Sequence, residues 1–285
     1  MAATAAIPHP AGLRHIAIIP CRWGASRFPG KPLALLGDMP LLWHVHQQCT
    51  NARFIADAIV ATDDKRIEAA CHQLGIRCVM TSDQPTGTDR VAQCAEHFEA
   101  DAYINVQGDE PFITPAAIDA VSEELAHLDD EFVAVNAYSK LSDAASALDH
   151  NVVKVVIGEC GRALMFSRQP IPYPRDEYPT YLRQLGLYGF TRRGLDIFRQ
   201  CDRGPLERTE GIEMLRLIEH GHQVREWFRP PRVDSPWTPQ WISRGPTKFY
   251  WKAQESSLPS AAVIDTSARQ QEPSPTKSTE GVGDA

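Results

Sequence analysis

Short apolar runs alternate with longer amphipathic stretches over the first half of this chain, and this alternation constrains the fold more than any other sequence feature. A short apolar run predicts a strand, whereas apolar residues three or four positions apart predict a helix. Strands and helices in turn predict a mostly parallel, doubly wound α/β sheet, whose ligands bind beyond the carboxyl ends of the strands. The predicted strands are residues 15–20, 58–62, 77–80, 102–106 and 132–137, and the predicted helices are 41–53, 64–74, 89–98 and 115–128.

The second half follows a different pattern. Residues 152–168 predict a β-hairpin with its turn at 159–161, and a Pro-rich loop follows at 171–179. The remaining predicted elements are a strand at 184–190, a helix around 209–219 and a strand at 223–228. We interpret this half as a smaller subdomain that shapes the site of a second substrate.

Composition changes near both ends of the chain. The stretch from residue 253 is rich in Ser, Thr, Pro, Gln and Glu, so it cannot bury enough apolar surface to offset its ordering entropy. We expect a flexible N-terminus at 1–13, a folded domain at 14–252 with halves at about 14–140 and 150–240, and a disordered tail at 253–285.

The overall charge limits the classes of partner. The chain has 29 Lys and Arg against 36 Asp and Glu, a net charge of −7, which gives no general attraction for nucleic acid. We find neither an apolar run long enough to span a membrane nor a signal peptide, and the seven cysteines include no C-x-x-C pair. These features predict a cytoplasmic protein that binds neither nucleic acid nor membrane.

A cation-rich loop follows the first predicted strand and reads PCRWGASRFPGKP over residues 20–32. Its glycines, serine, arginines and lysine allow backbone N–H groups and cations to converge on a polyphosphate. It is not a Walker A loop, because Pro32 follows Lys31, and it is not a G-x-G-x-x-G motif. The candidate phosphate-binding residues are Pro20, Arg22, Trp23, Gly24, Ala25, Ser26 and Lys31.

This loop and several later blocks resemble the family of CMP-Kdo synthetases, the 3-deoxy-manno-octulosonate cytidylyltransferases. The blocks are ATDD (61–64), TGTDR (86–90), NVQGDEP (105–111), VKVV (153–156), FSR (166–168), IPYPRD (171–176) and VDSP (233–236). The resemblance spans about residues 15–240. It implies a Rossmann-like fold of the nucleotide-diphospho-sugar transferase type, a homodimer, and an enzyme that transfers CMP from CTP to an acid with release of pyrophosphate.

The resemblance also assigns roles to residues. Arg22 and Lys31 would hold the triphosphate and stabilise the leaving pyrophosphate, and with Asp109 they form the predicted catalytic set. Asp109 follows an apolar strand, where a carboxylate can hold Mg²⁺ together with phosphate oxygens, and the implied second ligand is Asp234. Further predicted nucleotide-binding residues are Thr62, Thr86, Gly87, Arg90 and Gln107.

The acceptor side departs from the family pattern. Gln184 stands where the family has His, and Met214 stands where it has Gln; a Met side chain donates no hydrogen bond to a sugar hydroxyl. We therefore expect a smaller or more anionic acceptor such as phosphonoformate, with Kdo or an amino-Kdo as the alternative. The predicted acceptor-binding residues are Gln107, Arg168, Arg175, Gln184, Tyr188 and Glu213.

Other classes of function fit less well. A non-catalytic nucleotide-binding protein would not need both Asp109 and Asp234. A glycosyltransferase usually carries a D-x-D motif at the strand end, where this chain has GDEP at 108–111. Use of another nucleoside triphosphate remains open at this point.

Overall fold

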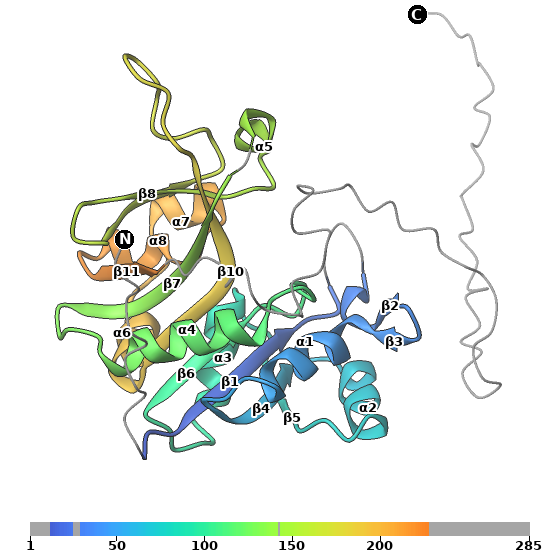
Figure 1. Ribbon diagram of the computed structural model, residues 1–285. Coiled ribbons are helices and arrows are strands. Elements are labelled where there is room, and N and C mark those ends of the chain that lie inside the picture. The colour runs from blue at the N-terminus through green and yellow to red at the C-terminus, as the bar shows by residue number, and fades with distance from the viewer. Residues whose placement is uncertain (1–11, 25–28, 142, 228–285) are drawn as a thin grey trace, which may run out of the picture. The chain divides into compact units, whose positions relative to one another are not determined.

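A mixed sheet with helices on both faces forms the centre of the molecule (Figure 1). The computed structural model describes residues 12–24, 29–141 and 143–227. Within them the large sheet has nine strands: β1 (His15–Cys21), β4 (Ile55–Thr62), β5 (Cys78–Met80), β6 (Ala102–Val106), β7 (Phe132–Lys140), β8 (Lys154–Ile157), β9 (Ala163–Ser167), β10 (Leu182–Thr191) and β11 (Gln223–Trp227). A separate small sheet pairs β2 (Leu35–Leu36) with β3 (Met39–Pro40).

The strand order is β11-β7-β10-β6-β1-β4-β5. β1 runs parallel to β4 and β6, and β4 runs parallel to β5, so the first half has the predicted parallel arrangement. β10 is antiparallel to both β6 and β7, and it thereby inserts a strand of the second half into the centre of the sheet. The two halves consequently share one continuous sheet.

Helices cover both faces because each strand alternates its side chains between them. In β1, Ile16 and Ile18 pack in one core cluster, and Ala17 and Ile19 pack in the other. Helices α3 (Gly87–Ala95), α6 (Arg192–Gln200) and α8 (Leu215–Glu219) contribute to the first cluster, and α1 (Leu41–Thr50), α2 (Lys65–Gln73) and α4 (Pro115–Ala126) to the second. The other helical elements are η1 (Lys31–Leu33), α5 (Ala144–Leu148) and α7 (Pro205–Glu210). Among the described residues, no helix has both the length and the apolar character needed to cross a bilayer.

The second half differs from its prediction in two places. The helix expected around 209–219 is two short helices, α7 and α8, because Gly211 adopts a left-handed conformation (φ +64°) that ends α7. Helix α6 was not predicted, since its sequence RRGLDIFRQ is strongly polar and contains a glycine. The predicted hairpin is confirmed as the antiparallel pair β8 and β9.

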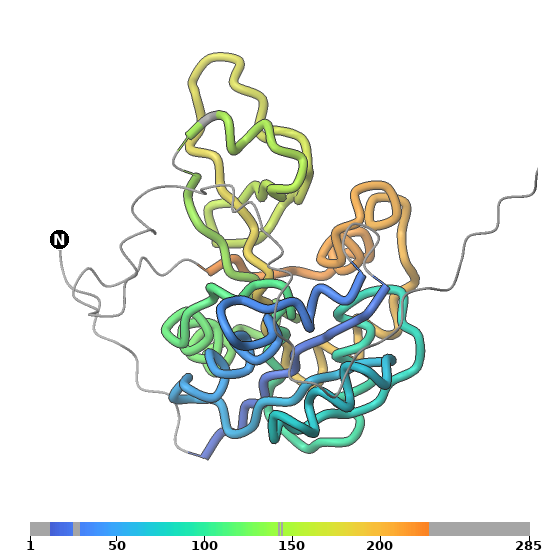
Figure 2. The backbone as a smooth tube through the Cα atoms, turned by 90° about the vertical axis from the view of Figure 1, so that its right-hand side faces the viewer, coloured from blue at the N-terminus to red at the C-terminus, as the bar shows by residue number. Residues whose placement is uncertain are grey.

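The Pro-rich loop after β9 projects from the body at the end remote from β4 and β5, as both views show (Figures 1 and 2). Tyr173 and Tyr178 in this loop are 84% and 91% exposed. Because these aromatic side chains are exposed, they do not pack into a hydrophobic core. Other elements of the second half make the contacts with the sheet.

Gly194 permits the close approach of α6 to β7. A Cβ atom at this position would lie 1.9 Å from the carbonyl oxygen of Val133. We expect Gly194→Ala to lower the free energy of unfolding by about 1–3 kcal/mol, because the backbone must shift to relieve the overlap. Urea denaturation measures this. At Gly158 the nearest atom to a new Cβ is 3.5 Å away, so Gly158→Ala is the matched control; equal stability of the two variants would contradict the packing argument.

Candidate active site

A cavity of about 280 Å³ lies at the carboxyl end of β1, beside the N-terminus of α3. Predicted nucleotide-binding residues form much of its wall: Pro20, Arg22, Thr86, Gly87, Arg90 and Gln107. The second half contributes Glu213, which we had placed with the acceptor, together with Arg203, Glu207 and Gly211, which were not predicted. The cavity therefore lies where the two halves meet.

The two described ends of the cation-rich loop are joined by a hydrogen bond beside this cavity. The backbone N–H of Gly30, in the left-handed region (φ +74°), donates to the carbonyl of Trp23 at 2.9 Å. The Trp23 ring is engaged by the Arg66 guanidinium, 3.4 Å from the ring centroid. Trp23 thus contacts Arg66 through its ring and Gly30 through its carbonyl. The preceding residue, Arg22, lines the cavity. Gly24 is exposed, and the predicted contacts of Ala25 and Ser26 lie outside the described residues.

Lys31 and Asp109 form an ion pair in which Nζ lies 2.9 Å from Oδ2. The Asp109 side chain, just beyond β6, is 57% exposed. An exposed carboxylate suits Mg²⁺, which takes one or two carboxylates and completes its shell with phosphate and water oxygens. Over the described ranges, no group of three or more His, Cys, Asp and Glu could hold a metal by itself. Asp109 therefore fits the predicted metal only together with a nucleotide, and the predicted ligand Asp234 lies outside the described residues.

Next to Asp109, the Glu110 side chain is half-buried, and this partial desolvation raises its pKa, whereas Arg183, 3.9 Å away, acts in the opposite direction. Gly186 of β10 packs directly on Gln107 and Glu110, since a Cβ there would approach both side chains within 3.1 Å. The end of β6 is thus covered by a strand of the second half.

Glu213 joins the second half to the nucleotide side. Its carboxylate accepts hydrogen bonds from the backbone N–H groups of Gly87 and Thr88, each at 2.9 Å, and from the Thr88 hydroxyl. Burial raises its pKa, although these hydrogen bonds act in the opposite direction. Thr86 caps the same helix and its hydroxyl donates to Asp89 at 2.6 Å. Glu213 therefore positions the start of α3 at the cavity wall.

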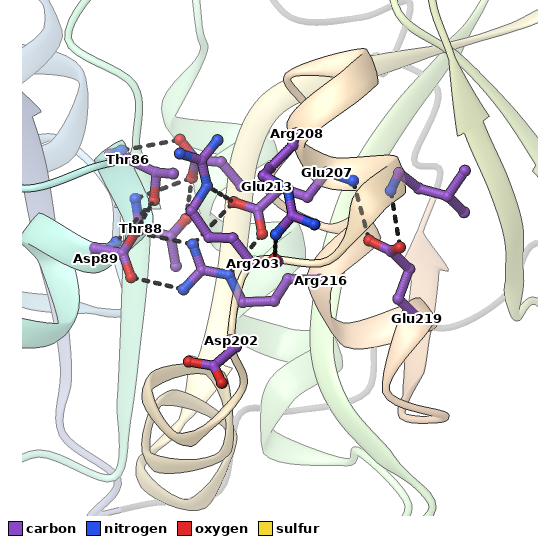
Figure 3. Close-up of polar contacts among 12 residues, drawn as sticks. Thr86, Thr88, Asp89, Asp202, Arg203, Glu207, Arg208, Glu213, Arg216 and Glu219 are labelled. Atoms are coloured by element: carbon purple, nitrogen blue, oxygen red, sulfur yellow. Dashed lines mark hydrogen bonds and ion pairs between the residues drawn. The ribbon is translucent and has the colours of Figure 1, made fainter.

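A buried ionic network fastens α7 and α8 to α3 (Figure 3). Arg216 donates two hydrogen bonds to Asp89 (2.7 and 2.9 Å) and two to Glu207 (2.8 Å each). Arg203, at the cavity, donates to Glu207 at 3.0 Å. Arg216 and Glu207 are 2% and 1% exposed, so the charges are paired away from water. The network fixes the positions of Arg203 and Glu213 relative to the TGTDR block at residues 86–90.

Several predicted residues make structural contacts instead of lining the cavity. Thr62 is fully buried, and its hydroxyl accepts from the backbone of Asp64 at 3.2 Å. Arg168 donates to the carbonyls of Glu210 (2.8 Å) and His150 (2.9 Å). Arg175 is exposed on the projecting loop, so the structure does not bring it to the cavity.

Three other predicted residues are buried at the cavity or behind it. Arg90 lines the cavity but is 2% exposed and paired with Asp63 at 2.7 Å. Gln184 is buried on β10, where its Nε2 donates to Asn136 at 2.6 Å. Tyr188 is buried beside Glu213, and burial together with that charge raises its pKa well above the usual value.

Sequence reasoning missed Arg203, Glu207 and Arg216. Charged residues in a short polar stretch are usually solvated, so nothing marked Glu207 and Arg216 as buried or Arg203 as part of the cavity wall. One signal in the sequence could have revealed Arg216, because it lies between two leucines, Leu215 and Leu217. Both leucines are fully buried in the structure.

Comparison with known proteins identifies the family. A family model described as Cytidylyltransferase matches residues 16–225, which include both walls of the cavity. The chain belongs to the cytidylyltransferase family. It is similar to the 3-deoxy-manno-octulosonate cytidylyltransferase of Solibacter usitatus, with 39% identity over 235 residues, 80% of this chain and 93% of the relative. It is also similar to the 8-amino-3,8-dideoxy-manno-octulosonate cytidylyltransferase of Shewanella amazonensis, with 39% identity over 228 residues, 77% of this chain and 93% of the relative.

A solved structure shows the same fold. The structure of a CMP:2-keto-3-deoxy-manno-octonic acid synthetase complexed with CTP has a TM-score of 0.71 and 36% identity, and the match covers 75% of this chain and 89% of that one. The predicted family, the fold and the class of enzyme, a nucleotidyltransferase, are thereby confirmed. The cavity of this cytidylyltransferase lies at the carboxyl ends of the strands, where doubly wound α/β sheets bind their ligands.

Proposed function

We propose that this cytidylyltransferase transfers CMP from CTP to an acid of the octulosonate class, 3-deoxy-manno-octulosonate or its 8-amino analogue, with release of pyrophosphate. The observation that carries the proposal is the cavity itself, because it joins the cation-rich loop to Glu213 of the second half. The named acceptors of its relatives support the octulosonate class. The comparisons give no support to phosphonoformate, the acceptor that sequence reasoning favoured.

The argument for phosphonoformate depended on two departures from the family pattern, Gln184, which is buried and donates to Asn136, and Met214. This side chain is fully buried in the core cluster that contains Leu215 and Leu217, and it does not line the cavity. We interpret it as a packing residue. The absence of a hydrogen-bond donor at this position therefore does not argue against a sugar acid.

The chain's own residues would act by positioning and by electrostatics. In the proposed reaction an acceptor oxygen attacks the α-phosphorus of CTP in line with the leaving pyrophosphate, and this needs little covalent chemistry from the protein. Arg22 and Lys31 would bind the triphosphate and stabilise the charge that develops on the pyrophosphate. The Thr86 hydroxyl, the Gln84 amide N–H groups and the Gly87 N–H already donate to protein groups. Recognition of cytosine therefore falls to the side-chain oxygen of Gln84 and the backbone carbonyls from Pro85 to Gly87, which line the cavity.

We propose Mg²⁺ as the cofactor, held by Asp109 and the phosphates of the nucleotide. When bound, it would neutralise phosphate charge and so favour attack by an anionic acceptor. Asp109 also holds Lys31 at 2.9 Å, which keeps this cation beside the phosphates without a further conformational change.

Substrate screening tests the proposed function. Purified protein is incubated with CTP, Mg²⁺ and one acceptor at a time, and pyrophosphate release is measured. We expect turnover with at least one of 3-deoxy-manno-octulosonate and 8-amino-3,8-dideoxy-manno-octulosonate, and at least about tenfold slower turnover with phosphonoformate, because only the octulosonates bring hydroxyl or amine donors. ATP, GTP and UTP in place of CTP serve as controls. Faster turnover of phosphonoformate would contradict the assignment of the acceptor.

A further inference from the structure

The cavity wall at residues 84–87 presents mainly hydrogen-bond acceptors. Its side-chain donors and the N–H of Gly87 are bonded to other protein groups, and Pro85 has no N–H. Within the described residues, only the backbone N–H groups of Gln84 and Thr86 remain as donors on this wall. The wall can therefore accept hydrogen bonds from a base, but it donates few in return.

Cytosine needs both kinds of partner. Along its Watson–Crick edge the exocyclic amino group is a donor, and the adjacent N3 and O2 atoms are acceptors. Uracil carries an acceptor oxygen in place of the amino group and a donor N–H at N3. A site that selects cytosine over uracil must therefore accept a hydrogen bond at the amino group and donate hydrogen bonds at N3 and O2.

Arginines are the strongest donors at this cavity. Among the described residues, Arg22, Arg90 and Arg203 line it. Arg22 belongs to the cation-rich loop and is the proposed ligand of the triphosphate. Arg90 is 2% exposed, and its guanidinium donates to Asp63, to the Thr81 hydroxyl and to the carbonyl of residue 82. Arg203 is therefore the arginine that remains for another part of the substrates.

The guanidinium of Arg203 offers two neighbouring donors to the cavity. Its Nε donates to Glu207 at 3.0 Å, and no other hydrogen bond of this guanidinium is made within the described residues. The terminal nitrogens Nη1 and Nη2 are thus available, and the side chain is 38% exposed. Two such N–H groups in a planar fork match two adjacent acceptor atoms.

Arg203 is held in position before any ligand binds. Its partner Glu207 is 1% exposed and accepts two hydrogen bonds from Arg216, which also donates two to Asp89. Asp89 in turn accepts from the Thr86 hydroxyl, and Figure 3 shows the Arg203 side chain extending toward Thr86. The network therefore fixes the donors of Arg203 relative to the acceptors of the wall at 84–87.

We infer that Arg203 determines the specificity for the base: its terminal N–H groups donate to N3 and O2 of cytosine, while the wall at 84–87 accepts from the amino group. The inference rests on the proposed function and deepens it. With UTP, the N3–H of uracil would face the guanidinium and the acceptor wall would face an oxygen, so hydrogen bonds would be lost at both places.

Binding of nucleotides without an acceptor tests the role of Arg203. Isothermal titration calorimetry of the full chain with CTP, UTP and pyrophosphate, in the presence of Mg²⁺, gives three dissociation constants. We expect the wild type to bind CTP at least about tenfold more tightly than UTP. In Arg203→Met the Kd for CTP should rise at least about tenfold, as expected for one bidentate contact to a base, whereas the Kd values for UTP and pyrophosphate should stay within about threefold.

Two further variants separate the fork from the charge and from general effects. Arg203→Lys keeps the charge but loses the planar fork, so it should discriminate between CTP and UTP as poorly as the Met variant does. Arg199→Met is the matched control, because Arg199 also pairs with one glutamate, Glu96, but does so at the surface. We expect this control to leave all three dissociation constants unchanged.

Several outcomes would overturn the inference while the proposed function stands. One is a wild type that binds CTP and UTP equally, and another is an Arg203→Met variant that keeps the wild-type ratio of the two constants within about twofold. Restoration of that ratio by Arg203→Lys would reduce the role of Arg203 to its charge. An equal loss of pyrophosphate and CTP binding would make Arg203 a phosphate ligand. If the wild type does not bind CTP, the proposed function fails and the inference fails with it.

Discussion

Asp109→Asn should lower kcat for pyrophosphate release by about 10²–10³-fold, the range found when one preorganised electrostatic contact is removed. The variant loses the carboxylate proposed to hold Mg²⁺ and the partner that keeps Lys31 beside the phosphates. The Lys31–Asp109 pair is exposed on both sides (35% and 57%), so the free energy of unfolding should change by less than about 1 kcal/mol. Steady-state kinetics with a varied Mg²⁺ concentration, together with thermal denaturation, check both expectations.

The control for this variant is Asp196→Asn, which removes an exposed carboxylate on α6. Its kcat should equal that of the wild type. If Asp109→Asn retains kcat within about threefold at every Mg²⁺ concentration, Asp109 is neither the metal ligand nor the residue that positions Lys31.

Arg216→Met should lower the free energy of unfolding by about 3–5 kcal/mol. The reason is that Asp89 and Glu207 would lose all four of the hydrogen bonds described above; Glu207 is 1% exposed and would keep only the single contact with Arg203. We also expect a higher KM for CTP, because the network positions the start of α3 at the cavity. Urea denaturation and CTP kinetics provide the two measurements.

Arg216→Lys gives a second variant if the Met variant does not fold. It keeps the charge but cannot make both bidentate contacts, so an intermediate loss of stability is expected. Arg199→Met is the matched control, because Arg199 pairs with Glu96 at the surface, where both side chains are more than 40% exposed; there the change should stay below about 1 kcal/mol. A loss below 1 kcal/mol for Arg216→Met would show that the network does not hold α8 to α3.

The first half of the fold could be predicted from sequence almost element by element. Strand β6 has the predicted bounds, and β1, β4, β5 and β7 differ by only a few residues. The reason is that alternating and 3.6-residue patterns are local properties of the chain. The second half was less predictable, because α7 and α8 depend on a left-handed Gly211 and the amphipathic helix α6 is short and mostly polar, with its buried face made by Gly194, Leu195 and Phe198.

The candidate site likewise has a part that the sequence predicted and a part that it did not. The cation-rich loop and Asp109 were found because a motif and a strand end are both visible in a few consecutive residues. Glu213 was found, but its contacts were not, because they join residues 126 positions apart. Arg175 was placed with the acceptor on residue type alone, and the structure puts it on a projecting loop.

By itself, the sequence determined the class of fold, the position of the cation-rich loop, the carboxylate at the end of β6 and the cytidylyltransferase family, because a few short contiguous blocks of sequence carry each of these features. Only the tertiary structure decided which charges are buried. Arg216 and Glu207 are paired in the interior, and Glu226 is buried there without a hydrogen-bond partner among the described residues, although all three resemble surface residues in the sequence. Burial depends on which strands and helices pack together, and the insertion of β10 between β6 and β7 brings the two halves into contact.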